Sequence, residues 1–203
     1  KLAVVPAEGG DPFLPAPELD RAVSGIRWSA DGRALLFAVE DDRASWIGRV
    51  AADGGKVERL TQGREVATDP SPGRDGGMAL LVSRPAEPAE VWALERGALR
   101  RLTHQNDALM AELRLGITED FTSVSADGTE VHGLMVQPAD YVAGRRYPTL
   151  LHIHGGPNGQ DDYSFGFDRE LYAAAGYVVL EINYRGSSGR GEAFQKAIYA
   201  DWG

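Results

Sequence analysis

The stretch YPTLLHIHGG, residues Tyr147–Gly156, decides the fold class of this chain. It begins as an apolar run and ends in two glycines, which is the pattern of a buried strand that stops at a turn. A second apolar run, GYVVLEINYRG at 176–186, follows the segment FDRELYAAAG at 167–176. That segment indicates a helix with Asp168 near its beginning and Gly176 as its stop. Strand, helix and strand predict a parallel α/β sheet buried on both faces.

The first half of the chain has a different pattern. Residues Ser24–Gly63 contain three short apolar runs separated by Asp and Gly turn signals, which is typical of antiparallel strands. The pattern then repeats, and the Leu-Thr pairs at 60–61 and 102–103 lie 42 residues apart. A four-stranded repeat of about 40 to 45 residues is the period of a β-propeller blade. The motif WSADG at 28–32 also resembles the signature of TolB-type propellers, whereas the alternative is a free-standing β-sandwich.

Composition excludes several classes of function. A chain of 203 residues with 43% hydrophobic residues can bury a real core. The net charge of -9 and the lack of a dense Lys/Arg run argue against nucleic acid or an anionic membrane as partner. The absence of cysteine excludes disulfides, thiolate nucleophiles and cysteine-ligated zinc, and it leaves the compartment open between cytosol and periplasm. The sequence contains no recognisable signal peptide or membrane-spanning run.

The histidines before the two glycines raise the question of a metal site. His152 and His154 are two residues apart, so in a strand they would face the same side and could both bind zinc. Zinc needs at least a third ligand. Asp161 and Asp162 follow in a segment that we expect to be too flexible to supply it. We therefore predict packed or hydrogen-bonded histidines and no metal.

The glycines themselves suggest an anion site. Ligands commonly bind after the carboxyl ends of parallel strands, and paired glycines let backbone amides approach a substrate oxygen without a Cβ in the way. In α/β-hydrolases such a loop supplies one donor of the oxyanion hole. The alternative for Gly155-Gly156-Pro157 is a plain turn, but a strand before it and a helix after it favour the oxyanion loop.

The next loop, NYRGSSGRG at 183–191, looks superficially like a nucleophile elbow. An elbow needs glycines two residues before and two after the serine. Gly186 precedes Ser188 correctly, but Arg190 stands where the second glycine is required. We therefore interpret the stretch as a shaped loop that Arg185 anchors.

Together these motifs resemble a known family. The repeats, HGGP at 154–157 and GYVVLEINYRGSSGRGEAFQKAIYADWG at 176–203 are similar to the prolyl oligopeptidase family (S9) of serine peptidases, in its acylaminoacyl-peptidase and dipeptidyl-peptidase-like branch. The resemblance implies β-propeller blades followed by the N-terminal part of an α/β-hydrolase domain. Residues 1–112 would be C-terminal blades of a TolB/WD40-like propeller, and residues 113–203 the first part of the peptidase domain.

The resemblance also implies roles for individual residues. The Gly156 amide would donate to the oxyanion, Gly155 would shape its loop, and Pro157 and Arg185 would help to hold it. In one branch of the family a tyrosine hydroxyl donates from the position of His154, so the histidine here is expected either to orient the loop or to donate weakly, and not to be catalytic. The catalytic Ser, Asp and His would all lie beyond Gly203, which leaves no catalytic residue in this chain.

The function that follows is a serine peptidase that hydrolyses short peptides through a serine ester, with the propeller restricting access and no cofactor. The chain has no initiator Met and ends inside an expected helix, so we expect it to be part of a longer polypeptide, inactive without the remainder of its own hydrolase domain. The alternatives are an esterase on the same α/β-hydrolase scaffold, or a non-catalytic binding module of the TolB type. Oligomeric state stays open.

Overall fold

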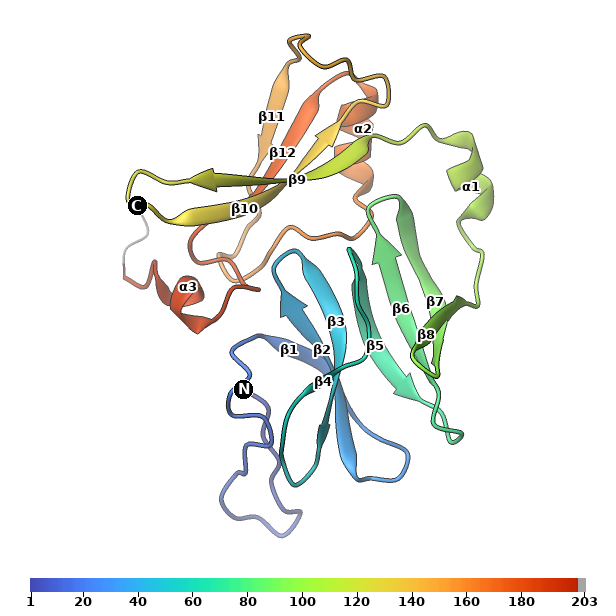
Figure 1. Cartoon of the computed structure of the whole chain (residues 1–203), viewed down its shortest axis with the longest axis vertical. Helices are drawn as coiled ribbons and strands as arrows, with labels where there is room; N and C mark the ends of the chain where they lie inside the picture. Colours follow the sequence, from blue (N-terminus) through green and yellow to red (C-terminus); the bar gives the residue numbers. More distant parts are fainter. Residues whose placement is uncertain (201–203) are drawn as a thin grey trace.

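The structure is a computed structural model that describes residues 1–200, which form two β-sheets and three short helices (Figure 1). An eight-stranded sheet is built from residues 23–101, and a four-stranded sheet from residues 117–183. Helix α1, Asp107–Glu112, lies in the connection between them. No helix among residues 1–200 combines the length and the apolar character needed to span a membrane.

The eight-stranded sheet consists of two successive antiparallel groups. One parallel bridge, between Ser45 and Val66, joins the groups. The first group is β1 (Val23–Trp28), β2 (Ala34–Asp41), β3 (Ala44–Ala51) and β4 (Glu58–Arg59), and the second is β5 (Val66–Pro72), β6 (Met78–Arg84), β7 (Glu87–Glu95) and β8 (Ala98–Arg101).

The two groups repeat the same chemistry. The hydroxyl of Thr61 accepts a hydrogen bond from the Ile47 N–H at 3.0 Å, and the hydroxyl of Thr103 accepts one from the Val91 N–H at 2.9 Å. Each threonine therefore follows the fourth strand of its group and satisfies a backbone donor of the third. The repeat predicted from the two Leu-Thr pairs is confirmed at the level of these two four-stranded groups.

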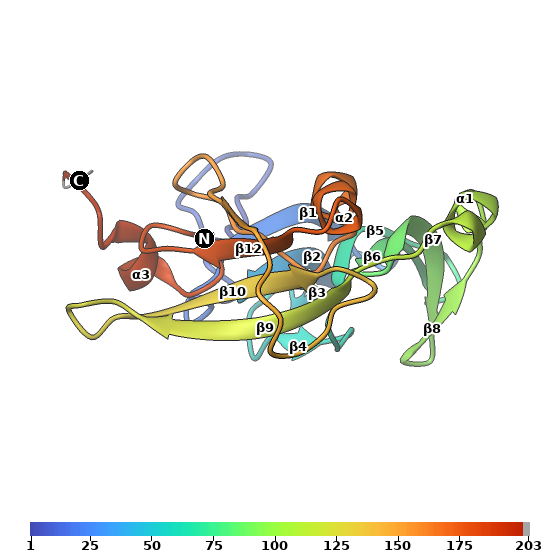
Figure 2. The same ribbon diagram turned by 90° about the horizontal axis from the view of Figure 1, so that it is seen from above.

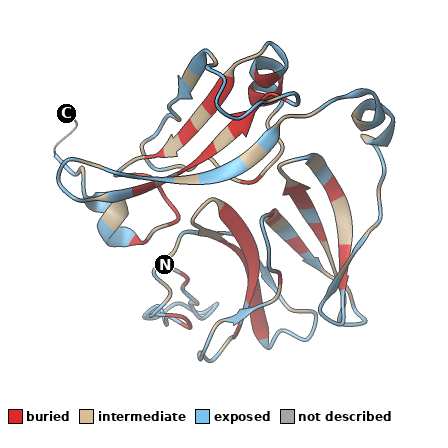
Figure 3. Ribbon diagram, turned by 45° about the horizontal axis from the view of Figure 1, so that its top comes forward, coloured by how far each residue is buried: buried red, intermediate tan, exposed pale blue. Residues whose placement is uncertain are grey.

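The core of this sheet lies on both sides of β2, whose first six residues are all buried (Figure 3). Phe37 and Val39 pack in a cluster on one side, whereas Ala38 packs with Ile47 and Leu80 in another. Side chains alternate between the faces of a strand, so β2 supplies apolar groups to both layers. A strand buried on both faces fixes the position of the β2–β3 turn.

The second sheet has the order β11, β12, β10, β9. Strands β11 and β12 are parallel, and the other neighbours are antiparallel. Helix α2, Phe167–Ala174, covers one face, where Ala173 packs on Val136 and Val179 (Figure 2). The strands are β9 (Ile117–Val124), β10 (Glu130–Gln137), β11 (Thr149–His152) and β12 (Val178–Asn183), and α3 (Glu192–Lys196) follows.

The parallel pair and its connecting helix were predicted correctly. Gly176, with φ of +90°, directly follows the end of α2, as expected of a glycine stop. The expectation that both strands are buried on both faces is wrong for β11. Leu151 of β11 is 57% exposed, and Ile153, directly after the strand, is 63% exposed, because β11 is an edge strand of the sheet within the described residues.

The two sheets meet through a small apolar contact. Ala44, at the start of β3, packs with Leu134 of β10 and with Tyr163, in the segment before α2. Burial and a hydrogen bond to Asp120 raise the pKa of Tyr163 to about 12. The β2–β3 turn of the first sheet therefore lies against the second sheet, close to the loops that follow β11 and β12.

Candidate functional site

The loop after β11 carries the glycines that the sequence singled out. Gly155 and Gly156 are both exposed, and Gly156 has φ of +137°, a conformation that favours glycine. A Cβ at Gly156 would lie 2.7 Å from the Asn158 N, which is too close for any other residue. Among the hydrogen bonds of residues 1–200, none is donated by the N–H of Gly155 or Gly156. Both amides are therefore free to meet a ligand.

His154 is held on several sides. Its ring stacks on that of Tyr184 with 4.6 Å between centroids, and the Tyr184 hydroxyl donates to the His154 carbonyl at 2.6 Å. The Nε2 atom lies 2.9 Å from the Ser187 hydroxyl, and Nδ1 lies 2.9 Å from the Gly155 carbonyl. In the neutral ring, Nδ1 donates to the carbonyl and Nε2 accepts from the hydroxyl. Both ring nitrogens are thus engaged in fixing the loop.

The loop after β12 is a support for this arrangement. Ser187 is fully buried, and the Ser188 N–H donates to the Gly159 carbonyl at 2.9 Å. Ser188, the serine of the failed elbow pattern, is also buried, which leaves it poorly placed to attack a substrate. Arg185 forms an ion pair of 2.7 Å with Asp127, in the turn between β9 and β10, and so ties the loop to that hairpin.

A cluster of ionisable groups lies beneath the loops. One ligand atom each of His152, Asp161 and Glu181 lie within 4.8 Å of one another, which is compatible with a metal ion. Glu181 is also paired with Arg169 at 2.6 Å, and both side chains are almost fully buried. The guanidinium therefore already neutralises one carboxylate, as a cation would. Burial raises the pKa of both Asp161 and Glu181.

Asp161, whose segment was expected to be too flexible to supply a ligand, is held beside His152. The Asp161 N–H donates to the Asn183 side-chain oxygen at 2.7 Å, and the Asn183 amide donates back to the Asp161 carbonyl at 2.9 Å. This reciprocal pair fixes Asp161 against the end of β12. His154 is absent from the cluster because its ring bonds Ser187 instead.

Reasoning from the sequence missed the β2–β3 turn as a part of this site. Gln160 accepts a hydrogen bond from the Arg43 N–H at 3.1 Å and donates one to the Ala44 carbonyl at 3.2 Å. Asp42 is 2.8 Å from Nδ1 of His132, whose Nε2 lies 2.7 Å from Glu130. The turn and the residues that it contacts are far apart in sequence. Only the charged run Asp41-Asp42-Arg43 could therefore have drawn attention to this part of the site.

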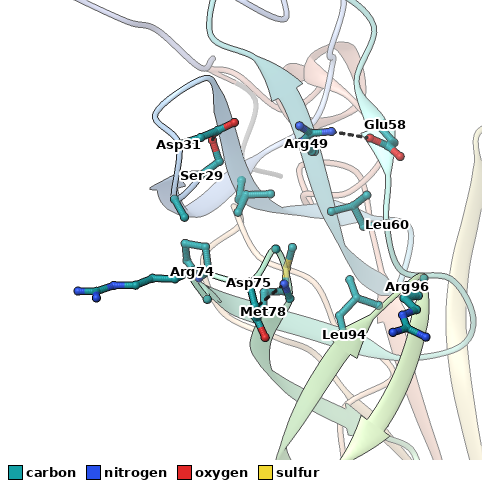
Figure 4. A pocket seen from close by; sticks show the side chains of 17 residues that line it. Ser29, Asp31, Arg49, Glu58, Leu60, Arg74, Asp75, Met78, Leu94 and Arg96 are labelled. Carbon is teal, nitrogen blue, oxygen red and sulfur yellow. Dashed lines mark hydrogen bonds and ion pairs between the residues drawn. The ribbon is translucent and has the colours of Figure 1, made fainter.

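A cavity of about 870 Å³ lies elsewhere, at the end of the eight-stranded sheet that faces away from these loops (Figure 4). Its lining mixes opposite charges with apolar side chains, and Arg49 and Glu58 neutralise each other across 3.5 Å. It brings together residues of the β1–β2, β5–β6 and β7–β8 turns. Of the residues singled out from the sequence, its lining contains Ser29, Ala30 and Asp31 of the WSADG motif and Leu60 of the first Leu-Thr pair.

Comparison with known proteins finds similarity to peptidases. Residues 163–203 match the prolyl oligopeptidase family. The chain is 34% identical over 123 residues to the uncharacterized peptidase YuxL of Bacillus subtilis, covering 60% of this chain and 19% of that protein. It is 28% identical over 199 residues to dipeptidyl-peptidase 5 of Aspergillus fumigatus, covering 93% of this chain and 27% of that protein. The chain thus spans under a third of the length of these relatives.

A solved structure has the same fold. An acylaminoacyl peptidase in complex with Z-Gly-Gly-Phe-chloromethyl ketone aligns with a TM-score of 0.82 and 24% sequence identity. The alignment covers 94% of this chain and 29% of the peptidase chain. The present structure therefore shares the fold of the part of that protein with which it aligns.

Proposed function

We propose that the protein containing this chain, whose residues 163–203 match the prolyl oligopeptidase family, is a serine peptidase that hydrolyses short peptides. The reaction is acyl transfer, in which a serine oxygen attacks the scissile carbonyl, the amine leaves and water then cleaves the serine ester. The observation that carries the proposal is the exposed, unused amide of Gly156 after a parallel strand. No cofactor is required for this chemistry.

The oxyanion is where the chain would act on the reaction. In the tetrahedral intermediate the carbonyl oxygen becomes negative, and a fixed N–H donor stabilises it more than the neutral carbonyl. Gly156 supplies such a donor, and Gly155 leaves the approach open. His154, Pro157 and Arg185 hold the loop, and the second donor, the nucleophile, the base and its carboxylate are contributed by residues outside this chain. By itself the chain is therefore inactive.

Architecture supports the same proposal. Residues 1–112, with their two four-stranded groups, are proposed to be blades of a β-propeller that restricts access to the site. Residues 113–203 are proposed to begin an α/β-hydrolase domain. The exposed apolar edge of β11 is suited to pairing with a further strand of that domain, since an open edge with apolar side chains invites strand addition.

Short peptides are the proposed substrates for two reasons. The structural neighbour holds a peptide-like chloromethyl ketone, and several relatives are dipeptidyl-peptidases. An esterase would use the same oxyanion loop, so the activity should be measured on matched peptide and ester substrates. Hydrolysis of the esters alone would contradict the peptidase assignment.

The donor role is tested by two substitutions in the complete protein. Gly156→Pro removes the amide hydrogen, and we expect turnover to fall about 10²- to 10³-fold, with substrate binding changed less. His154→Ala leaves that amide in place and should cost less. The Gly156→Pro protein must first be shown to fold and to bind a substrate-like inhibitor. Near-normal turnover of this variant, together with a large loss for His154→Ala, would assign the role to the histidine.

A further inference from the structure

We propose that the β2–β3 turn of the first sheet, residues 42–44, positions the loop that carries Gly156, and that it acts through the side chain of Gln160. The inference rests on the proposed function of Gly156 and adds a positioning residue to it. Residues 42–44 and Gln160 lie more than a hundred positions apart in sequence, yet they are joined by hydrogen bonds.

Gln160 pairs with the turn as a backbone segment would. Its side-chain oxygen accepts from the Arg43 N–H at 3.1 Å, and its side-chain nitrogen donates to the Ala44 carbonyl at 3.2 Å. A primary amide carries one acceptor and two donors on one plane, so it can satisfy a backbone donor and a backbone acceptor together. The partly buried amide therefore fixes the end of the loop in both position and direction.

The turn also contacts the segment after Gln160 and the loop after β12. The Tyr163 N–H donates to the Arg43 carbonyl at 2.7 Å, and the Asp42 N–H donates to the Gly189 carbonyl at 3.0 Å. A Cβ at Gly189 would overlap the Gln160 side-chain oxygen and lie 2.9 Å from the Asp42 N. The turn, Gln160 and the loop after β12 are thus packed without space for adjustment.

The turn is itself anchored in the second sheet. Asp42 bonds His132 at 2.8 Å, and Arg43 donates to the Gly133 carbonyl at 3.2 Å and pairs with Asp120 at 3.4 Å. His132, Gly133 and Asp120 belong to β10 and β9. Each contact joins the turn to regular strands, so the turn is a rigid reference for the loop.

The glycine loop has few bonds of its own. Gly159 donates to the Pro157 carbonyl at 2.8 Å, and Gly155 and Gly156 donate none within residues 1–200. His154 holds the beginning of the loop through Ser187. Its end is held by Gln160 together with the Ser188 bond to Gly159 and the Asp161–Asn183 pair. Loss of the Gln160 bonds would let this end shift and leave the Gly156 amide poorly aimed, and a misplacement of about 1 Å can cost roughly 100-fold in rate.

The test compares Gln160→Ala, the similarly sized Gln160→Met and the exposed control Gln105→Ala in the complete protein. Two kinds of quantity are measured: kcat and KM on a peptide substrate, and hydrogen exchange of the Gly159 and Ser188 amides, whose hydrogen bonds form the end of the loop. We expect both Gln160 variants to lose roughly 10- to 100-fold in kcat, with KM changed less, and to exchange faster at these two amides than the wild type. Gln105→Ala should match the wild type.

Unchanged exchange of the Gly159 and Ser188 amides in both Gln160 variants would overturn the proposal. So would full activity of Gln160→Met, because packing and not hydrogen bonding would then hold the loop. The exchange measurement needs no turnover. It therefore decides the positioning role even if Gly156→Pro keeps its activity, a result that contradicts only the proposed oxyanion donor.

Discussion

Removal of the buried guanidinium of Arg169 should destabilise the protein strongly and in a pH-dependent way. Arg169 donates to Glu181 at 2.6 Å and to the Asp162 carbonyl at 3.2 Å, and it also donates to the Ser164 carbonyl. The side chains of Arg169 and Glu181 are 5% and 8% exposed. Arg169→Met therefore leaves a carboxylate buried without its partner, which typically costs about 3–5 kcal/mol.

The sign of the pH dependence follows from the pKa of Glu181. Burial already raises this pKa above its ordinary value of 4.5, and Arg169 opposes the rise. Loss of Arg169 raises the pKa further, so the folded variant binds a proton more tightly than the unfolded chain. Protonation then stabilises the variant fully below pH 4.5, and this stabilisation is lost as the pH rises through the raised pKa. At low pH only the lost backbone contacts remain, about 1–3 kcal/mol.

Urea denaturation at pH 8 and below pH 4.5 measures both free energies of unfolding. The matched control is Arg185→Met, which breaks an exposed ion pair with Asp127 and should cost under about 1 kcal/mol. The double variant Arg169→Met/Glu181→Leu should recover most of the loss, since apolar groups can replace a buried pair. An equal loss at both pH values, or no recovery in the double variant, would refute the reasoning.

Two further predictions concern positions outside the loops. Hydrogen bonds from Thr103, and then from the Asn106 backbone, lower the pKa of Glu90 from 4.5 to about 2, so its stabilising contribution is present above pH 4.5 and is lost as the pH falls towards 2. Glu90→Gln should therefore lower the Tm at pH 7 in thermal unfolding, and a gap that stays constant down to pH 2 would count against this. Gly133→Ala should lower the free energy of unfolding by about 1–3 kcal/mol in urea denaturation, because a Cβ would overlap Phe121 and the neighbouring strand. The control is Gly77→Ala, where a Cβ makes ordinary contacts only, and its stability should stay near that of the wild type.

The parts of the fold that could be predicted from the sequence are those determined by residues close together in the chain. The helix between β11 and β12 ends before Gly176, since only glycine adopts a φ of +90° without strain. The strand repeat was visible because Thr61 and Thr103 each satisfy a donor of their own group. In both cases the residue lies within about 15 positions of the helix or strand that it stabilises or ends. The pattern can therefore be recognised in a short stretch of sequence.

The parts that sequence missed depend on partners that are distant along the chain. Gln160 and Arg43 are 117 positions apart, and Asp161 and Asn183 are 22 apart. An amide side chain that bonds a backbone group leaves no periodicity and no motif, because nearly any backbone can serve as its partner. The exposure of β11 was missed for a different reason: an apolar run indicates burial but does not say which strand is at the edge.

A backbone hydrogen bond within the loop and side-chain contacts from outside it would affect the Gly156 amide differently. A plain turn commonly closes with a backbone N–H bonded to a carbonyl three residues earlier, and such a bond uses the donor. Here the loop is fixed by side chains at its ends, His154 through Ser187 and Gln160 through the β2–β3 turn, so its shape does not depend on the Gly156 amide. An oxyanion donor must be unoccupied and yet held in place, since reorganisation during the reaction would cancel its benefit. Anchoring a glycine loop from outside meets both conditions, which supports the oxyanion role for this loop over a turn chosen for flexibility alone.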